Sequence, residues 1–180
     1  HASTEGTVDL LRWAKAQDIP LTAEVTPHHL LLTDERLETY DGVNRVNPPL
    51  REQRDVEALR AALIDGTVDC VATDHAPHTR EEKAQPYAQA PSGLPLVQYA
   101  LQVALEHVHE ARLTRAQVVQ KFAHAPAQLF DVEGRGFLRE GYFADLVLVE
   151  DVPFTVKRED VLSKCGWSPF EGTTFRSRIA

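Results

Sequence analysis

An apolar run at residues 68–72 ends abruptly in one carboxylate and two imidazoles, and this feature constrains the fold more than any other. The run is rich in residues that favour β-structure and predicts a buried strand. Asp74, His75 and His78 follow it directly. Parallel α/β folds place their reactive groups at the carboxyl ends of strands. The run therefore predicts a parallel strand that ends in side chains able to bind a metal or move a proton.

Helical and extended patterns alternate along the first 130 residues. Helices are predicted at 5–17, 52–65, 94–110, 114–122 and 125–130, a helical turn at 34–38, strands at 19–25 and 68–73, a Pro-Pro loop at 44–51 and a polar loop at 79–91. This alternation predicts parallel β/α units. From about residue 133 glycines punctuate short segments, and the apolar run 144–149 predicts a strand. We therefore predict an α/β part over 1–132 and a β-rich domain over 133–180.

Composition excludes several classes of function. With 180 residues, 43% of them hydrophobic, the chain is long enough for one domain with a real core. Its net charge of −8, with no runs of Lys or Arg, argues against a nucleic-acid partner, and no apolar stretch is long enough to cross a membrane. The two cysteines, Cys70 and Cys165, fit a reducing cytoplasm and exclude a cysteine-based zinc knuckle, and Cys70 is expected to be a core thiol. The chain opens on His1 and contains no Met, so we expect the C-terminal part of a longer protein.

Other polar residues lie near the ends of predicted strands and loops. His1, the pair His28-His29 and Asn47 are candidates to share one face with Asp74, if the units belong to a barrel. Each also has an ordinary explanation. His1 is a terminal residue, His28-His29 are explained as structural histidines, and Asn47 and Asp74 as residues that shape turns. The remaining histidines lie on predicted helices and are expected to be surface or capping residues: His107, His109 and His124.

Five motifs, in order, resemble the signature series of dihydroorotases, which belong to the amidohydrolase superfamily. They are HAST at 1–4, EVTPHHL at 24–30, VNPPLR at 46–51, ATDHAPH at 72–78 with Glu82-Lys83 downstream, and ADLVLV at 144–149 followed by SPFEG at 168–172. The resemblance implies a metal-dependent (β/α)8 TIM barrel plus a small β-sandwich. Residues 1–132 would form the C-terminal barrel units, and 133–180 would add sandwich strands. The loop at 91–96 lacks the GLET element common in many dihydroorotases.

The resemblance also implies a reaction and a set of roles. Dihydroorotases reversibly hydrolyse the cyclic amide of dihydroorotate to N-carbamoyl-L-aspartate in pyrimidine biosynthesis, using a metal-activated hydroxide. The implied roles are metal ligands at His1 and Asp74, a proton shuttle at Asp74, substrate contacts from Asn47 and His78, and backbone substrate contacts at Ser92 and Gly93. One or two zinc ions are implied, with the remaining ligands and a substrate-binding arginine upstream of this chain. No ligand role is carried over to His28-His29, and His75 is at most a supporting residue.

Three alternatives stay open on the sequence. The chain can belong to another cyclic amidase, such as an allantoinase or hydantoinase. It can belong to a catalytically inactive homologue that serves as a structural partner of another enzyme, or it can be an α/β domain with incidental histidines. The expected partner is a small-molecule substrate, and a homodimer would follow if the helix predicted at 94–110 packs between subunits.

Overall fold

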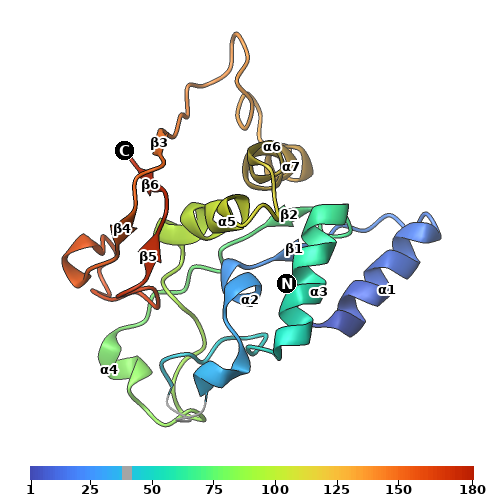
Figure 1. Ribbon diagram of the computed structural model, residues 1–180. Coiled ribbons are helices and arrows are strands. Elements are labelled where there is room, and N and C mark those ends of the chain that lie inside the picture. The colour runs from blue at the N-terminus through green and yellow to red at the C-terminus, as the bar shows by residue number, and fades with distance from the viewer. Residues whose placement is uncertain (38–41) are drawn as a thin grey trace.

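The computed structural model describes residues 1–37 and 42–180 (Figure 1). The helices are α1 (Glu5–Ala16), α2 (Pro27–Leu31), α3 (Gln53–Asp65), α4 (Arg80–Lys83), α5 (Ala100–His109), α6 (Arg115–Val119) and α7 (Ala125–Leu129). Shorter 3-10 turns are η1 (Asp34–Leu37), η2 (Val97–Tyr99) and η4 (Arg158–Asp160), and η3 (Gln120–His124) is a π-helical turn. The strands are β1 (Glu24–Val25), β2 (Cys70–Val71), β3 (Val149–Glu150), β4 (Phe154–Thr155), β5 (Thr174–Phe175) and β6 (Arg178–Ile179).

The strands β1 and β2 pair in parallel, which confirms the prediction of parallel β/α units in this part of the chain. Glu24 lies opposite Cys70, and Val25 lies opposite Val71. On the other side of β1, the backbone N–H of Ala2 donates to the Glu24 carbonyl at 2.8 Å. Residues 1–3 therefore run beside β1, which places His1 and the end of β2 at the same edge.

Both strands are shorter than predicted, and the reason lies in their hydrogen bonds. Residues 19–25 were expected to be extended, but Pro20 has no N–H to donate to a ladder. The N–H of Ala23 is bound by the Asp69 carboxylate at 2.8 Å instead of by a neighbouring strand. The ladder is thus limited to the residues nearest the polar strand ends.

The two long N-terminal helices form as the sequence predicts. Thr4 caps α1 by accepting the N–H of Thr7 at 3.1 Å, and α3 ends at Gly66, whose φ of 88° is the left-handed conformation that glycine adopts at low cost. The carboxylate of Asp55 on α3 accepts the Glu5 N–H at 2.8 Å, which joins the start of α1 to α3. Figure 1 shows these two helices side by side.

The later helices differ from the prediction. The helix expected at 94–110 begins only at η2 and α5, because Leu94 is engaged in a parallel bridge with His75. The two helices expected at 114–122 and 125–130 form one run in which the π-turn η3 joins α6 to α7. The turn expected at 34–38 is η1, and its last predicted residue lies outside the described part of the chain.

Two apolar clusters form the core. The first packs α1, α3 and the paired strands together through residues such as Val8, Val25, Leu59, Leu63 and Val71. The second joins the segment 94–103 to the tail and includes Leu94, Leu96, Tyr99, Val103, Val156, Trp167, Phe170 and Phe175. Cys70 is buried, as expected of a core thiol. The second cluster contains residues from both sides of position 132, so the domain boundary near residue 132 stays a prediction.

The apolar run at 144–149 was expected to form a strand, and for most of its length that expectation is wrong. Only Val149 and Glu150 pair, antiparallel to β6. The residues before them are highly exposed, with Leu138 at 88% and Leu146 at 70%. Figure 1 shows this segment, between α7 and β3, extending away from the body. A strand needs partners for its backbone N–H and C=O groups, and among the described residues this run has one such partner before Val149, the Ala180 N–H, which donates to the Leu148 carbonyl at 2.9 Å.

Candidate functional site

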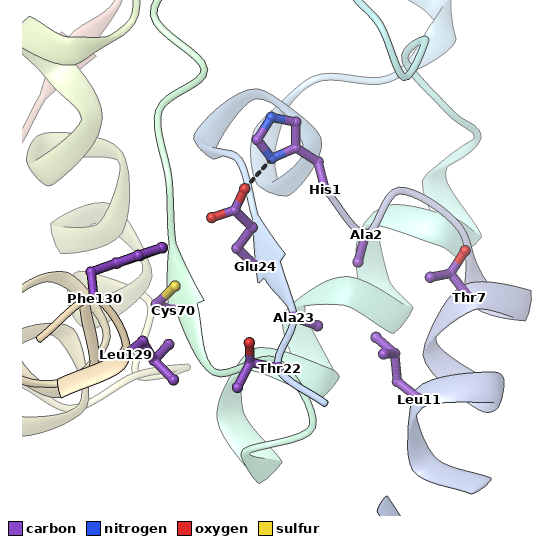
Figure 2. Close-up of a pocket in the computed structure, with 10 residues that line it drawn as sticks. All are labelled: His1, Ala2, Thr7, Leu11, Thr22, Ala23, Glu24, Cys70, Leu129 and Phe130. Carbon is purple, nitrogen blue, oxygen red and sulfur yellow. Dashed lines mark ion pairs between the residues drawn. The ribbon is translucent and has the colours of Figure 1, made fainter. Parts of the chain in front are cut away.

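The imidazole of His1 lies between two carboxylates. Its Nδ1 is 2.8 Å from Oε1 of Glu24, and its Nε2 is 3.7 Å from Oδ1 of Asp74. Figure 2 shows Glu24 reaching from β1 to the ring, with Cys70 on the neighbouring strand. His1, Glu24 and Cys70 line a cavity of about 500 Å³, to which Leu129 and Phe130 also contribute. The structure therefore brings His1 and Asp74 together, as the motif series predicts.

A left-handed backbone conformation aims the Asp74 carboxylate. Asp74 follows β2 and has a φ of 47°, which is uncommon for a residue with a Cβ. Aspartate is among the few residue types that tolerate this region, at a cost of about 1–2 kcal/mol. A residue held in this way next to a buried strand is typical of functional sites.

The separation of His1 and Asp74 fits a shared metal. At 3.7 Å their nearest atoms are too far apart for a hydrogen bond. Two ligands of one tetrahedral zinc ion, each bound at about 2.1 Å, lie roughly 3.4 Å apart. Imidazole nitrogen and carboxylate oxygen are also zinc's usual ligands. Within residues 1–37 and 42–180 no group of three or more His, Cys, Asp or Glu is placed to hold a metal.

His78 and the loop at 92–94 form a second part of the candidate site. The imidazole Nε2 of His78 donates to the Ser92 carbonyl at 3.0 Å, and the Gly93 N–H donates to the Arg45 carbonyl at 3.0 Å. Gly93 has a φ of 134°, and a Cβ there would lie 2.5 Å from the Cβ of Ala76. Only glycine therefore fits this close approach. The Ser92 carbonyl and the Gly93 amide, expected to contact substrate, are both engaged within the protein.

Asn47 is exposed and precedes a cis peptide bond to Pro48. The loop is held from below by His29, whose Nε2 lies 3.1 Å from the Pro48 carbonyl and 3.3 Å from the Pro49 carbonyl. The Asn47 side chain thus sits on a rigid support. The structure does not bring it into contact with His1 or Asp74.

The pair His28-His29 is buried on α2 and bound to its surroundings. The Thr26 hydroxyl lies 3.1 Å from Nε2 of His28 and 2.7 Å from Nδ1 of His29. Burial, with the neighbouring His29, lowers the pKa of His28 to about 3. Burial also lowers the pKa of His29. Both rings are therefore neutral at physiological pH, and the hydrogen bonds of His29 join α2 to the Pro-Pro loop.

The other histidines have packing partners. Nδ1 of His75 accepts the N–H groups of Leu96 and Val97 at 3.0 and 3.2 Å, which makes His75 a support for the next loop. The expectation that His107 is a surface or capping residue is wrong, because its side chain is 3% exposed. Its position on the inner face of α5 explains this burial. His109 contacts the Ser177 hydroxyl, and His124 stacks on Phe137.

The sequence analysis named Glu82-Lys83 beside the ATDHAPH motif but did not predict that these residues order the polar loop at 79–91. The fully buried Lys83 donates from Nζ to the carbonyls of Arg45 and Pro91, both at 2.9 Å. The short helix α4 carries a capping box between Thr79 and Glu82. The order Thr-x-x-Glu is the sequence signature of such a box and could have predicted this helix. A single buried lysine has no comparable signature.

Comparison with known proteins identifies the family. The amidohydrolase family matches residues 7–168. The chain is 47% identical over 182 residues to a dihydroorotase of Mycobacterium leprae, covering 99% of this chain and 42% of the relative. It is 44% identical over 174 residues to a dihydroorotase of Staphylococcus aureus, covering 96% and 41%. The chain therefore belongs to the amidohydrolase family, and it spans about 42% of the length of the first of these relatives.

Solved structures agree on the fold. An L-hydantoinase (dihydropyrimidinase) from Arthrobacter aurescens superposes with a TM-score of 0.92 at 26% identity, covering 99% of this chain and 41% of that one. A dihydropyrimidinase from Brevibacillus agri superposes with a TM-score of 0.91 at 25% identity, with the same coverage. The chain thus has the fold of part of an amidohydrolase of the TIM-barrel type. Within the described residues no helix is long and apolar enough to span a membrane.

Proposed function

We propose that the protein to which this chain belongs is a dihydroorotase, which reversibly hydrolyses the cyclic amide of dihydroorotate to N-carbamoyl-L-aspartate. The observation that carries the proposal is the placement of His1 Nε2 and Asp74 Oδ1 at 3.7 Å, on two segments that lie on either side of β1. The dihydroorotases at 42–47% identity support it. Since the chain spans less than half of those relatives, the activity is proposed for the protein at its full natural length.

The proposed cofactor is one or two zinc ions, held in part by His1 and Asp74. Bound zinc supplies a Lewis acid for the scissile carbonyl and a water of lowered pKa. The other ligands, and the arginine expected to bind the substrate carboxylate, would come from residues outside this chain. Such a division is consistent with the described residues, among which no group of three or more possible ligands is placed together.

Asp74 is the proposed proton shuttle. Its side chain is 35% exposed, so the carboxylate is accessible from solvent rather than sealed in the core. As a carboxylate it accepts the proton released when water adds to the ring amide. It then returns that proton to the ring nitrogen as the carbon–nitrogen bond breaks. Its fixed left-handed backbone keeps the oxygen atoms aimed at the same place throughout.

His78 and Asn47 are the proposed substrate contacts. Because Nε2–H of His78 donates to the Ser92 carbonyl, Nδ1 of the neutral ring is an acceptor. It can accept the N–H of a cyclic amide, and a protonated ring can instead donate to a carboxylate. The exposed Asn47 amide offers both a donor and an acceptor. Ser92 and Gly93 are proposed to shape this side of the site through their backbone.

A second cyclic amidase activity is the nearest competitor. The close superposition on a hydantoinase and a dihydropyrimidinase favours it, as does the missing GLET element at 91–96. Hydantoins and dihydropyrimidines share the cyclic amide of dihydroorotate but lack its ring carboxylate. Recognition of that carboxylate therefore separates the two activities.

The test is an assay of the full natural-length protein, loaded with zinc, on dihydroorotate, hydantoin, dihydrouracil and allantoin. We expect hydrolysis of dihydroorotate, cyclisation of N-carbamoyl-L-aspartate, and loss of both in an Asp74→Asn variant. Turnover of another ring in preference to dihydroorotate would replace the proposal with that amidase. No turnover of any ring by folded, zinc-loaded protein would indicate a catalytically inactive structural partner.

Assembly and location remain predictions. A homodimer through the region 94–110 would give twice the monomer mass by sedimentation equilibrium of the full natural-length protein. A monomer at all concentrations would contradict it. The expected cytoplasmic location is checked by cell fractionation.

A further inference from the structure

The His1 ring is held on the side away from Asp74. Nδ1 of His1 and Oε1 of Glu24 are 2.8 Å apart, which is hydrogen-bond distance, and Figure 2 shows the two side chains meeting end to end. The backbone carbonyl of Glu24 also accepts the N–H of Ala2, the residue next to His1. One residue of β1 therefore fixes both the ring and the backbone beside it.

We propose that Glu24 is a positioning residue for metal binding, which orients the His1 imidazole and selects its tautomer so that the Nε2 lone pair faces Asp74. The inference rests on the proposed metal site. A neutral imidazole has one N–H and one free nitrogen, and a partner on one nitrogen decides which is which. With Nδ1–H donating to Glu24, Nε2 carries the lone pair that a metal needs. Carboxylates commonly set metal-bound histidines in this way.

The placement of Glu24 fits this role better than a general contribution to stability. Side chains alternate along a strand, and Val25 on the opposite face is buried in the core. Glu24 instead faces the cavity with 31% of its side chain exposed. Within residues 1–37 and 42–180 no Lys or Arg forms an ion pair with it, so His1 is its one ion-pair partner there. An exposed ion pair of this kind contributes little to folding, which leaves orientation as its main effect.

The adjoining strand segment offers a matched control. Asp69 forms an ion pair with Lys15 at 2.8 Å, the same distance as between Glu24 and His1. The two pairs are similarly exposed, at 24% and 28% against 31% and 22%. Asp69 also binds the Ala23 N–H, so it stabilises the same sheet without facing Asp74. Removal of the Asp69 charge therefore reports the effect of losing an ordinary ion pair near β1.

The experiment measures the affinity of the full natural-length protein for Zn²⁺ by competition with a chelator, and the visible spectrum of the Co²⁺ form. The proteins are wild type, Glu24→Ala, Glu24→Gln and Asp69→Asn, each checked for folding by circular dichroism. We expect Glu24→Ala to bind Zn²⁺ about 10–100-fold more weakly and to change the Co²⁺ spectrum. Glu24→Gln should recover most of the affinity, because its amide oxygen still accepts from Nδ1–H. Asp69→Asn should stay within about threefold of wild type, since outer partners of a ligand, rather than distant ion pairs, set affinity.

The outcomes separate this inference from the proposed reaction. Wild-type affinity and an unchanged Co²⁺ spectrum in Glu24→Ala would overturn the inference, and so would an equal loss in Asp69→Asn. If a His1→Ala variant binds Zn²⁺ as wild type does, the proposed metal site is wrong, and so is the proposed role of Glu24. If the metal data come out as expected but dihydroorotate is not hydrolysed, the role of Glu24 stands and only the proposed substrate is wrong.

Discussion

His1 and His29 both lie close to β1, and each has Nδ1 bound by the side chain of another residue, Glu24 for His1 and Thr26 for His29. Their second nitrogen atoms differ. Nε2 of His29 lies against the carbonyls of Pro48 and Pro49, deep in the core. Nε2 of His1 faces the Asp74 carboxylate across 3.7 Å at the edge of a cavity. The comparison teaches that the free nitrogen, rather than the residue type, makes a histidine available as a ligand.

The largest expected effect concerns the group that faces the available nitrogen. We predict that Asp74→Asn lowers kcat for dihydroorotate hydrolysis by about 10²–10⁴-fold, the usual contribution of a positioned acid or base. Asparagine tolerates the left-handed backbone at this position, so the fold should survive. Steady-state kinetics and circular dichroism measure the two quantities. A folded variant that keeps more than a tenth of the wild-type kcat would contradict the role of Asp74.

The contrast between His1 and His29 predicts that substitution of His29 lowers stability, whereas substitution of His1 lowers zinc affinity. His29→Ala removes bonds to Thr26 and the Pro-Pro loop and leaves a buried gap, so the free energy of unfolding should fall by about 2–4 kcal/mol. His1→Ala should change it by less than about 1 kcal/mol, since a partly exposed ion pair contributes little. Zinc affinity should respond in reverse, falling only in His1→Ala. Urea unfolding and chelator competition give both values, and loss of the same property in both variants would end the distinction.

Much of the site could be predicted because its residues lie in short motifs at strand ends. Asp74 and His78 follow a recognisable apolar run, and His1 matched the HAST motif. The partner of His1 could not be found in this way, because Glu24 lies 23 positions away and meets the ring only when residues 1–3 align beside β1. Contacts of that range depend on strand register, which local pattern does not specify.

The same contrast between local patterns and long-range contacts separates the parts of the fold that could be predicted from those that could not. Helices α1 and α3 follow from their own periodicity and caps, with Thr4 before the first and Gly66 after the second. The strand expected at 144–149 failed because strands depend on partners elsewhere in the chain. His107 was misjudged because a histidine on an amphipathic helix gives no signal of which face it occupies.

The buried histidines also predict a pH dependence of stability. Folding lowers the pKa of His28 from about 6.5 to about 3, so below pH 6.5 the unfolded chain binds the extra proton. The stabilising effect of the neutral ring is complete above pH 6.5 and is lost as the pH falls toward 3. Between pH 7 and pH 5, wild type should lose about 2 kcal/mol more than His28→Leu. Urea unfolding at the two pH values measures this, and parallel losses would show that His28 does not titrate on unfolding.

The smallest expected effect lies at the contact between the tail and the site loop. The indole Nε1 of Trp167 donates to the His78 carbonyl at 2.8 Å. Trp167→Phe keeps most of the buried ring but removes this bond, at a cost of about 1 kcal/mol of stability. Because loss of this bond loosens the His78 loop, KM for dihydroorotate should rise while kcat changes less. Steady-state kinetics of the variant and of wild type measure KM and kcat. A fall in kcat with an unchanged KM would count against a positioning effect.

The most direct test of the central claim is an anomalous difference map, collected at the zinc absorption edge from crystals of the full natural-length protein. The account predicts a peak about 2.1 Å from both His1 Nε2 and an Asp74 carboxylate oxygen, with Glu24 still on Nδ1. It predicts no peak beside His28 or His29. A zinc peak at that buried pair, or zinc bound without His1 and Asp74, would contradict it.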